Sequence, residues 1–467
     1  MKKFDLAVVG SGPGGYRAAV LAALRGLKVA IVEKDAWGGC CLNRGCVPKK
    51  DWYHSARLIA ASGGFGQRGI CGELSGDLTR AWQHQHEVVA AIRASYQDYL
   101  KRLGVVLCSG AARFADAATL AVDGARIAAT NFIVATGAAP CVPPNLQRIA
   151  RRVVTTDDLF AAPPPAGKRV AIIGSGVVAT EFSFILAMFG LEVVWLAQHE
   201  PLASRGYSAT ARRMLQARLA DFGVRARTAS RVRSLQADEN GVRLELPDGT
   251  QEHVDWVLLG TGRLPHTASL HPAQAGVALD ARGFIIVNRF QQTSQPHIYA
   301  VGDVANPAMT SNHALAEAAV AVANVIAPQT RASDPGAVPD VVYSALELAR
   351  IGLGEEGAEA LGCEPATGFT AFETNPAALV EDDAAGFVRV VADADTGKLL
   401  GAEIAGSAAG ELIHLAGIEF GSPDALARLA ALPYNHPARA EEILNAIETL
   451  AARWGLKAQV FTPLRGR

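Results

Sequence analysis

Two glycine-rich turns of the same kind, each set between a strand and a helix, constrain this chain more than any other feature. The first, Gly10-Ser11-Gly12-Pro13-Gly14-Gly15, follows the apolar strand Phe4–Val9 and precedes a helix and the strand Lys28–Val32. The second, Gly174-Ser175-Gly176-Val177-Val178-Ala179, follows the strand Arg169–Ile173 and precedes a helix and the strand Glu192–Leu196. In such units the glycines let backbone approach a pyrophosphate, and the helix N-terminus faces the phosphates. The sequence therefore predicts two dinucleotide sites on Rossmann-like α/β domains.

The two units differ in the residue that would contact a ribose. Glu33 ends the second strand of the first unit, where a carboxylate accepts hydrogen bonds from ribose hydroxyls. The equivalent position of the second unit is Ala197, which neither holds a 2′-hydroxyl nor repels a 2′-phosphate. Gln198, His199 and Arg205 follow; they tolerate a phosphate without forming an arginine-rich clamp. The second site is thus compatible with either NAD or NADP.

Composition limits the class of protein and its partners. The chain has 467 residues, of which 50% are apolar and 19% charged, with a net charge of −1. These values predict several globular domains and argue against nucleic acid or a membrane surface as the main partner. The N-terminus is typical of a strand and not of a signal peptide, and no apolar run is long enough to span a membrane. The seven cysteines are therefore expected to be reduced thiols in a cytoplasmic protein, apart from any catalytic disulfide.

Proline-rich stretches suggest the domain boundaries. Pro163-Pro164-Pro165 lies just before the second glycine-rich unit, and a second linker spans Pro328–Pro339. Buried strands are expected at Ile285–Val287 and Ile298–Val301, and a later one at Phe387–Val391. We therefore expect a first nucleotide-binding domain made of residues 1–150 and 271–338, a second of residues 151–270, and an α+β domain of residues 339–467.

A cysteine pair follows the first unit, in Gly39-Cys40-Cys41-Leu42-Asn43-Arg44-Gly45-Cys46-Val47-Pro48-Lys49-Lys50. In an ideal helix the Cα atoms of Cys41 and Cys46 would be about 8–9 Å apart. A disulfide needs roughly 4.4–6.8 Å, so a bond between them requires a distortion, for which Gly45 is the natural place. A zinc site has the wrong spacing, with only the adjacent Cys40 to help, and a pair of inert buried thiols is the other alternative. We predict no metal site.

Taken with further motifs, the sequence resembles a known enzyme family. These motifs are Ala135-Thr136-Gly137, Gly260-Thr261-Gly262-Arg263-Leu264-Pro265, Tyr299–Val304, and His436-Pro437 with Glu441. The whole chain resembles the FAD-dependent pyridine nucleotide–disulfide oxidoreductases, which include dihydrolipoamide dehydrogenase and glutathione reductase. The resemblance implies a homodimer with an FAD domain, an NAD(P) domain and a C-terminal dimerisation domain.

The resemblance also implies the roles of individual residues. Cys46 matches the flavin-proximal thiol, Cys41 the thiol that exchanges with substrate, and His436 the base that reaches the cysteines of the other subunit, oriented by Glu441. Lys50 matches the lysine that pairs with Glu181 beside the flavin, although the Lys49-Lys50 doublet leaves open which lysine pairs. The implied FAD contacts are Gly10, Gly12, Gly15, Glu33, Gly39, Lys50, Ala112, Thr136, Gly137, Ala138, Asp303, Met309, Thr310, Ser311 and Asn312. The implied NAD(P) contacts are Gly174, Gly176, Ala179, Glu181, Ala197, Gln198, Val232 and Gly262.

The substrate is expected to be a small dithiol or disulfide. Gly12–Tyr16 and Cys41-Leu42-Asn43 are most similar to dihydrolipoamide dehydrogenase, which favours dihydrolipoamide, free or on a lipoyl-carrying protein. Lys49-Lys50 and Glu441-Glu442 are more similar to glutathione reductase, which makes an NADPH-dependent disulfide reductase the alternative. A flavoprotein partner of a lipoylated carrier, with impaired nicotinamide turnover, is a further alternative. Cys40, where the family usually has threonine, is expected to be inert.

Overall fold

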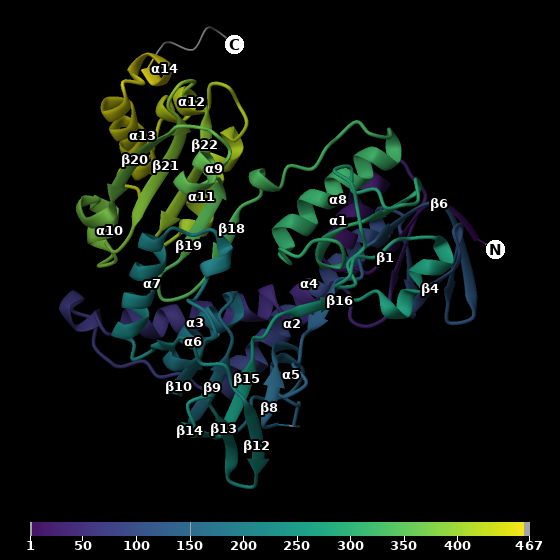
Figure 1. The fold of residues 1–467 in the computed structure, drawn as a ribbon, viewed down its shortest axis with the longest axis horizontal. Coiled ribbons are helices and arrows are strands. Elements are labelled where there is room, and N and C mark those ends of the chain that lie inside the picture. Colours follow the sequence, from purple (N-terminus) through teal and green to yellow (C-terminus); the bar gives the residue numbers. More distant parts are fainter. Residues whose placement is uncertain (1, 150, 462–467) are drawn as a thin grey trace.

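The computed structural model describes residues 2–149 and 151–461. The expected domain boundary at residue 150 and the end of the chain after residue 461 therefore lie outside the described residues. Three α/β lobes surround a central region in which the helices α2 and α3 lie (Figure 1). None of the helices in the described part is long and apolar enough to cross a membrane.

The first lobe is built on a seven-stranded sheet. Its order is β3-β2-β1-β6-β5-β4, and β17 pairs with β6. β1, β2, β3, β6 and β17 pair in parallel, whereas β4, β5 and β6 form an antiparallel meander. The strands are β1 (Lys2–Val9), β2 (Val29–Glu33), β3 (Val106–Ser109), β4 (Ala112–Asp116), β5 (Thr119–Val122), β6 (Ala125–Val134) and β17 (Ile298–Ala300).

The chain therefore returns to the first sheet after completing the second lobe. The expected strand at Ile298–Val301 is confirmed as β17. The expected strand at Ile285–Val287 is wrong, because only Ile285 forms a single bridge, to Leu279, and Ile286 is half exposed. An apolar run of three residues fitted a strand, but its middle residue faces solvent and its neighbours form turns.

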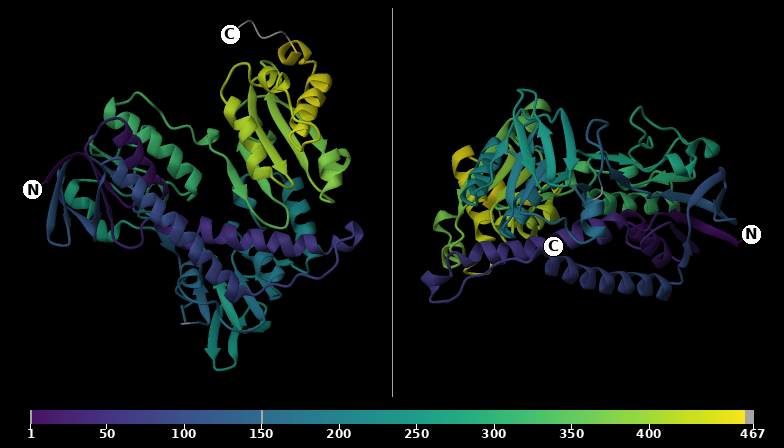
Figure 2. Two further views of the ribbon diagram at one scale, coloured as in Figure 1. Left: turned by 180° about the vertical axis from the view of Figure 1, so that it is seen from behind. Right: turned by 90° about the horizontal axis from the view of Figure 1, so that it is seen from below.

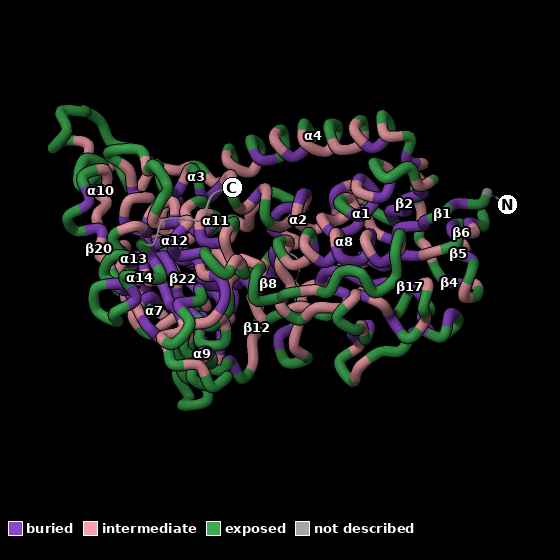
Figure 3. The backbone as a smooth tube through the Cα atoms, turned by 90° about the horizontal axis from the view of Figure 1, so that it is seen from above, coloured by how far each residue is buried: buried purple, intermediate pink, exposed green. Residues whose placement is uncertain are grey.

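Helices α1 (Pro13–Leu24) and α8 (Ser311–Ile326) pack together on one face of this sheet. Small buried residues such as Ala18, Ala19 and Ala22 let α1 lie close to the strands. Helices α2 (Gly39–Arg44), α3 (Cys46–Ser62) and α4 (Leu78–Arg102) leave this lobe. Figure 2 shows α4 lying along the outside of the molecule, and most of its surface is exposed or half-buried in Figure 3.

The second lobe is built on a parallel sheet of order β11-β10-β9-β15-β8. Strands β9 and β10 have the bounds expected from the sequence. A three-stranded antiparallel sheet, β12-β13-β14, extends from it, and β7 and β16 pair as a two-stranded connection. The elements are β7 (Ala138–Pro140), β8 (Val153–Thr155), α5 (Thr156–Ala161), β9 (Arg169–Ile173), α6 (Val177–Met188), β10 (Glu192–Leu196), α7 (Ala209–Asp221), β11 (Ala226–Arg227), β12 (Ser234–Asp238), β13 (Gly241–Glu245), β14 (Gln251–Val254), β15 (Trp256–Leu259) and β16 (Arg263–Pro265).

Helix α6 joins the second lobe to the cysteine-bearing helix α3. Its side chains are apolar on nearly every side, as expected for a helix covered on both faces. One face covers its own sheet, and the other packs Phe182 and Phe184 against Trp52 and Tyr53 of α3. This packing brings the N-terminus of α6, which follows the second glycine-rich turn, next to the N-terminus of α3.

The C-terminal lobe is an antiparallel sheet of order β18-β19-β22-β21-β20 covered by helices. The expected strand from Phe387 is confirmed as β21. The elements are β18 (Asp340–Val342), β19 (Leu348–Gly352), α9 (Glu355–Ala360), β20 (Pro365–Ala371), α10 (Pro376–Val380), β21 (Phe387–Asp393), β22 (Leu399–Ala405), α11 (Ala409–Glu419), α12 (Ala425–Ala430), α13 (Glu441–Trp454) and α14 (Lys457–Phe461).

Candidate active site

A cavity of about 1080 Å³ runs from the first glycine-rich turn, past the cysteines, to the N-terminus of α6. At the turn, Gly10 has φ +99°, and a Cβ there would lie 2.3 Å from the carbonyl oxygen of Ala135. A Cβ on Gly15 would lie 1.9 Å from the Gly10 oxygen, so that position must be glycine for α1 to approach β1. A Cβ on Gly12 would meet no atom within 4 Å. The backbone of Gly12 is therefore open to a ligand in the cavity.

Glu33 is held rigidly at the end of β2. Its side chain is buried and accepts hydrogen bonds from the backbone NH of Ser11 (2.9 Å), the Ser11 hydroxyl (2.6 Å) and the NH of Asp35 (2.9 Å). The second turn has no such carboxylate: Ser175 Oγ accepts a hydrogen bond from the NH of His199 (3.0 Å), and Ala197 is fully buried. The two turns thus differ structurally where the sequence differs.

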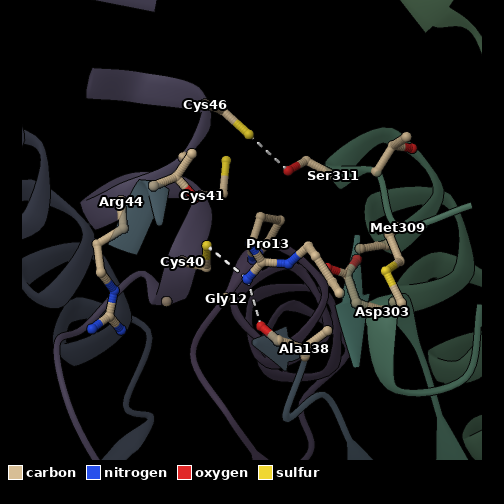
Figure 4. Close-up of a pocket in the computed structure, with 18 of the residues that line it drawn as sticks. Gly12, Pro13, Cys40, Cys41, Arg44, Cys46, Ala138, Asp303, Met309 and Ser311 are labelled. Carbon is tan, nitrogen blue, oxygen red and sulfur yellow. Dashed lines mark hydrogen bonds between the residues drawn. The ribbon is translucent and has the colours of Figure 1, made fainter. Parts of the chain in front are cut away.

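The cysteine segment is distorted at the expected residue. Helix α2 ends at Arg44, Gly45 has φ −138° and ψ −111°, and α3 begins at Cys46. This break brings Cys41 and Cys46, both free thiols, close enough for each to shift the pKa of the other. Figure 4 shows both sulfur atoms in the cavity, with Ser311 opposite Cys46.

The two thiols have opposite acid–base character. A hydrogen bond donated by Cys41 lowers the pKa of Cys46 to about 7, against the effect of burial, and Ser311 and Lys49 lower it further. The pKa of Cys41 is raised well above its usual range, first by that same hydrogen bond and then by burial. Ser311 Oγ lies 3.1 Å from Cys46 Sγ. Cys46 also begins α3, and a helix N-terminus favours an anion. Cys46 is therefore the thiol poised to ionise.

A lysine–glutamate ion pair lies beside the cysteines, and it uses Lys49. Lys49 Nζ is 2.8 Å from Glu181 Oε1, and both side chains are largely buried. The same carboxylate oxygen accepts a hydrogen bond from the backbone NH of Tyr343 (2.9 Å). The sequence left open which lysine forms this pair, and it is not Lys50, whose Nζ lies 3.3 Å from the centre of the Tyr343 ring. The two lysines are adjacent on α3, so their side chains point in different directions.

Cys40 lines the same cavity and contacts Arg263. A guanidinium nitrogen of Arg263 lies 3.3 Å from Cys40 Sγ and donates to the carbonyl of Ala138 (2.6 Å) (Figure 4). Burial raises the pKa of the Cys40 thiol, which Arg263 only partly opposes. Cys40 therefore stays protonated more readily than Cys46.

The residues expected to contact FAD gather around this cavity. The side chains or backbone that line it belong to Gly10, Gly12, Glu33, Gly39, Lys50, Ala112, Thr136, Gly137, Ala138, Asp303, Met309, Thr310, Ser311 and Asn312. Gly15 lies behind the turn. Burial raises the pKa of Asp303, and Arg263 opposes this shift.

The residues expected to contact NAD(P) do not all line the cavity. Gly176, Glu181 and Gly262 line the cavity. Gly174 and Ala179 shape the second turn: Gly174 has φ +148°, and a Cβ there would lie 2.3 Å from the oxygen of Gly260. Gln198 is exposed at the end of β10. Val232 is buried in the apolar core beneath the sheet, so its side chain is not available as a contact.

Arg205 lines the cavity, and its guanidinium is held there by residues of the other two lobes. Its guanidinium donates to the carbonyl of Ala308 (3.1 Å) and to Asp340 Oδ1 (2.7 Å). Only 20% of its side chain is exposed. The sequence order placed it near Ala197, but long-range hydrogen bonds orient it towards the other two lobes.

His436 lies in the C-terminal lobe with its side chain 70% exposed. Its Nδ1 is 2.9 Å from Glu441 Oε1, and Glu441 Oε2 accepts a hydrogen bond from the NH of Ala438 (2.8 Å). The hydrogen bond with His436 is the main cause of the lowered pKa of Glu441. The imidazole is thus oriented by Glu441 and exposed to solvent. The His436–Pro437 peptide bond is cis.

Comparisons with known proteins show the family to which this chain belongs. Residues 4–323 match the family model "Pyridine nucleotide-disulphide oxidoreductase", and residues 338–447 match the dimerisation domain of the same family. The chain belongs to this family of FAD-dependent flavoprotein disulfide oxidoreductases, which use NAD(P)H. The dimerisation domain supports a homodimer.

Individual relatives in this family have different activities in their names. The chain is 34% identical to a dihydrolipoyl dehydrogenase of Thermus scotoductus over 96% of this chain and 98% of that protein. It is 32% identical to a glutathione reductase of Burkholderia cepacia, over 95% and 98% respectively. Among solved structures, it is similar to the Cu(II) complex of the HOCl-induced flavoprotein disulfide reductase RclA from Escherichia coli, with a TM-score of 0.84, 26% identity, and coverage of 96% and 99%.

The residues around the cavity fit FAD. The open backbone at Gly12, the N-terminus of α1 and the carboxylate of Glu33 suit a pyrophosphate and a ribose. The cavity then continues to Cys46 and to the Lys49–Glu181 ion pair. A flavin placed there would have the thiols and the second nucleotide-binding turn within the same cavity.

Two contacts of the site were not foreseen. Tyr343 supplies an NH to Glu181, and Ser311, expected only beside the flavin, touches Cys46. Ser311 and Cys46 lie 265 residues apart in the sequence, and no local pattern links them. They meet because the N-termini of α3 and α8 both open into the same cavity.

Proposed function

We propose that this enzyme transfers an electron pair between a small dithiol, favouring dihydrolipoamide, and NAD or NADP. One observation carries the proposal. A single cavity is lined by the first nucleotide-binding turn, by Cys41 and Cys46, and by Glu181 of the helix that follows the second turn. A dithiol, a flavin and a nicotinamide can therefore react in sequence without leaving the protein.

The thiol half of the reaction begins from the Cys41–Cys46 disulfide. His436 of the partner subunit removes a proton from the dithiol, whose thiolate attacks Cys41 Sγ and breaks the disulfide. Cys46 leaves as a thiolate, which suits its lowered pKa. The second substrate sulfur then displaces Cys41, and oxidised substrate departs from a reduced Cys41/Cys46 pair.

The nicotinamide half takes place beside the ion pair. FAD held in this cavity would supply the acceptor for the electron pair of the reduced thiols and the donor of hydride to the nicotinamide. Lys49 and Glu181 hold a fixed positive and negative charge at this position, where hydride is exchanged. The second turn has Ala197 in place of a ribose carboxylate, so both nicotinamide nucleotides are candidates.

A glutathione reductase-like activity is the second candidate. The observation that favours it is the use of Lys49, since the lysine doublet is the feature of this segment most similar to glutathione reductase. In that case electrons run from NADPH to a disulfide such as oxidised glutathione.

Steady-state assays of the holoenzyme distinguish the two. We expect dihydrolipoamide to be oxidised with NAD or NADP, and oxidised glutathione to be reduced poorly by either reduced nucleotide. Cys41→Ser should abolish turnover, whereas Cys71→Ser, at an exposed cysteine outside the cavity, serves as the control. NADPH-dependent reduction of glutathione without dihydrolipoamide activity would contradict the lipoamide proposal. An intact dithiol reaction with neither nucleotide would instead identify a carrier partner with impaired nicotinamide turnover.

A further inference from the structure

One guanidinium joins all three lobes. Arg205 follows β10 in the second lobe, donates to the carbonyl of Ala308 in the first, and is paired with Asp340 in the third. Its own carbonyl accepts a hydrogen bond from Arg350 of β19 (2.9 Å). The Arg205 and Asp340 side chains are only 20% and 13% exposed, so solvent weakens this pair less than a surface ion pair. Arg205 is therefore fixed on several sides.

The segment that Arg205 holds leads directly to the redox thiol. Two residues after Ala308 comes Thr310, which caps α8, and then Ser311, which is the first residue of that helix. Ser311 Oγ lies 3.1 Å from Cys46 Sγ. Beyond it, Asn312 Nδ2 donates to the carbonyl of Pro339 (2.9 Å), the residue before Asp340. Ser311 is thus anchored on both sides, and both anchors involve the chain at residues 339–340.

We propose that Arg205 is a positioning residue, which fixes the Ser311 hydroxyl at hydrogen-bond distance from Cys46 by holding Ala308 and Asp340 together. The inference rests on the proposed function, because it assigns a role to Cys46 as the ionised thiol. A hydrogen bond from a hydroxyl to a thiolate weakens steeply when the two atoms move apart. A clamp three residues from Ser311 is well placed to prevent that movement.

Other charged groups also lie close to Cys46 and to Arg205. The variants are therefore chosen to distinguish the effects of those groups from the effect of Arg205. Cys41, Lys49 and Glu181 surround Cys46. Asp340, Arg350 and His313 surround Arg205. Arg205→Lys keeps the positive charge but replaces the planar fork that reaches two acceptors at once. Asp340→Asn leaves Arg205 unchanged and weakens its other anchor.

The measurement is the pH midpoint of the long-wavelength absorbance that a Cys46 thiolate gives against bound flavin in the dithiol-reduced holoenzyme. We expect Ser311→Ala to raise this midpoint by about one pH unit. Arg205→Lys and Asp340→Asn should each raise it by about half a unit. When Ser311→Ala is already present, neither Arg205→Lys nor Asp340→Asn should raise the midpoint further. The Ser311–Cys46 contact through which they act is then gone. Arg169→Gln, which breaks ion pairs with Glu192 and Glu252 in the same lobe, is the matched control.

The outcomes separate this inference from the function on which it rests. A wild-type enzyme without the absorbance contradicts the proposed function. A wild-type absorbance whose midpoint is the same in Arg205→Lys and Asp340→Asn overturns the positioning role. Shifts that persist in the Ser311→Ala background overturn the route through Ser311 and indicate a direct charge effect. Bound FAD and the melting temperature of each variant, measured beforehand, show whether the fold is retained.

Discussion

At the scale of single residues, the site depends on two sulfur atoms with opposite tendencies to ionise. Cys46 accepts the hydrogen bond that Cys41 donates and lies beside Ser311 and Lys49, which lowers its pKa from 9.0 to about 7. The ionised form therefore predominates above about pH 7 in the reduced enzyme, and protonation removes it below. We predict that the thiolate absorbance rises with pH with a midpoint near 7; a midpoint near 9 would contradict the assignment. By linkage, reduced enzyme gains stability from Cys46 above the unfolded pKa and loses it as pH falls through 7.

The two adjacent lysines give a second prediction at this scale. Lys49→Met leaves Glu181 buried without its cation, whereas Lys50→Met removes a charge that faces the Tyr343 ring. We expect the first change to slow reduction of the flavin by NADH or NADPH by roughly 100-fold, and the second by less than about tenfold. Anaerobic stopped-flow absorbance of the two variants measures these rates. A larger loss of rate in Lys50→Met than in Lys49→Met would show that Lys50 is the lysine that acts in flavin reduction.

At the scale of elements, the glycines of the first turn separate folding from binding. A Cβ on Gly15 meets the Gly10 oxygen at 1.9 Å, whereas a Cβ on Gly12 meets no protein atom and projects where the pyrophosphate would lie. We predict that Gly15→Ala lowers the free energy of unfolding by more than about 3 kcal/mol. Gly12→Ala should fold normally yet bind FAD at least about tenfold more weakly. Thermal melts and FAD titrations test this, with Gly354→Ala as the control because its Cβ also meets no atom.

The elements that the sequence predicted correctly are those that local patterns determine. Strands β9 and β10 and the break at Gly45 follow from local patterns, so they were foreseen to the residue. The choice between Lys49 and Lys50 depends on how α3 is rotated against α6, which no local pattern records. The partners of Arg205 were not foreseen for the same reason, since they are 103 and 135 residues away in the sequence. The prediction of a strand at Ile285–Val287 was wrong because a run of three apolar residues is too short to show the alternation of buried and exposed side chains that marks a strand.

At the scale of the whole molecule, we propose that His436 of a second subunit completes the site formed by the cysteines. His436 is exposed and turns one ring nitrogen to Glu441, which leaves the other free for a second subunit of the homodimer. We predict that Cys41→Ser and His436→Ala homodimers are each reduced in activity by at least about 100-fold. Hybrid dimers containing one subunit of each kind should recover activity, because one of their two sites has both the cysteines and the histidine.

Co-expression with two different affinity tags allows these hybrids to be purified and assayed. Hybrids as inactive as the parents would contradict the use of His436 across the subunit interface. Size-exclusion chromatography of each preparation verifies that the dimer is retained.

The most direct test of the account is to add dihydrolipoamide anaerobically to the oxidised holoenzyme and record its absorption spectrum. We predict that a long-wavelength thiolate–flavin band appears rapidly when dihydrolipoamide is added. This response should be absent in Cys41→Ser and slower in His436→Ala. An unchanged spectrum, together with flavin reduction by NADPH, would contradict the dihydrolipoamide assignment and favour a glutathione-type disulfide as the substrate.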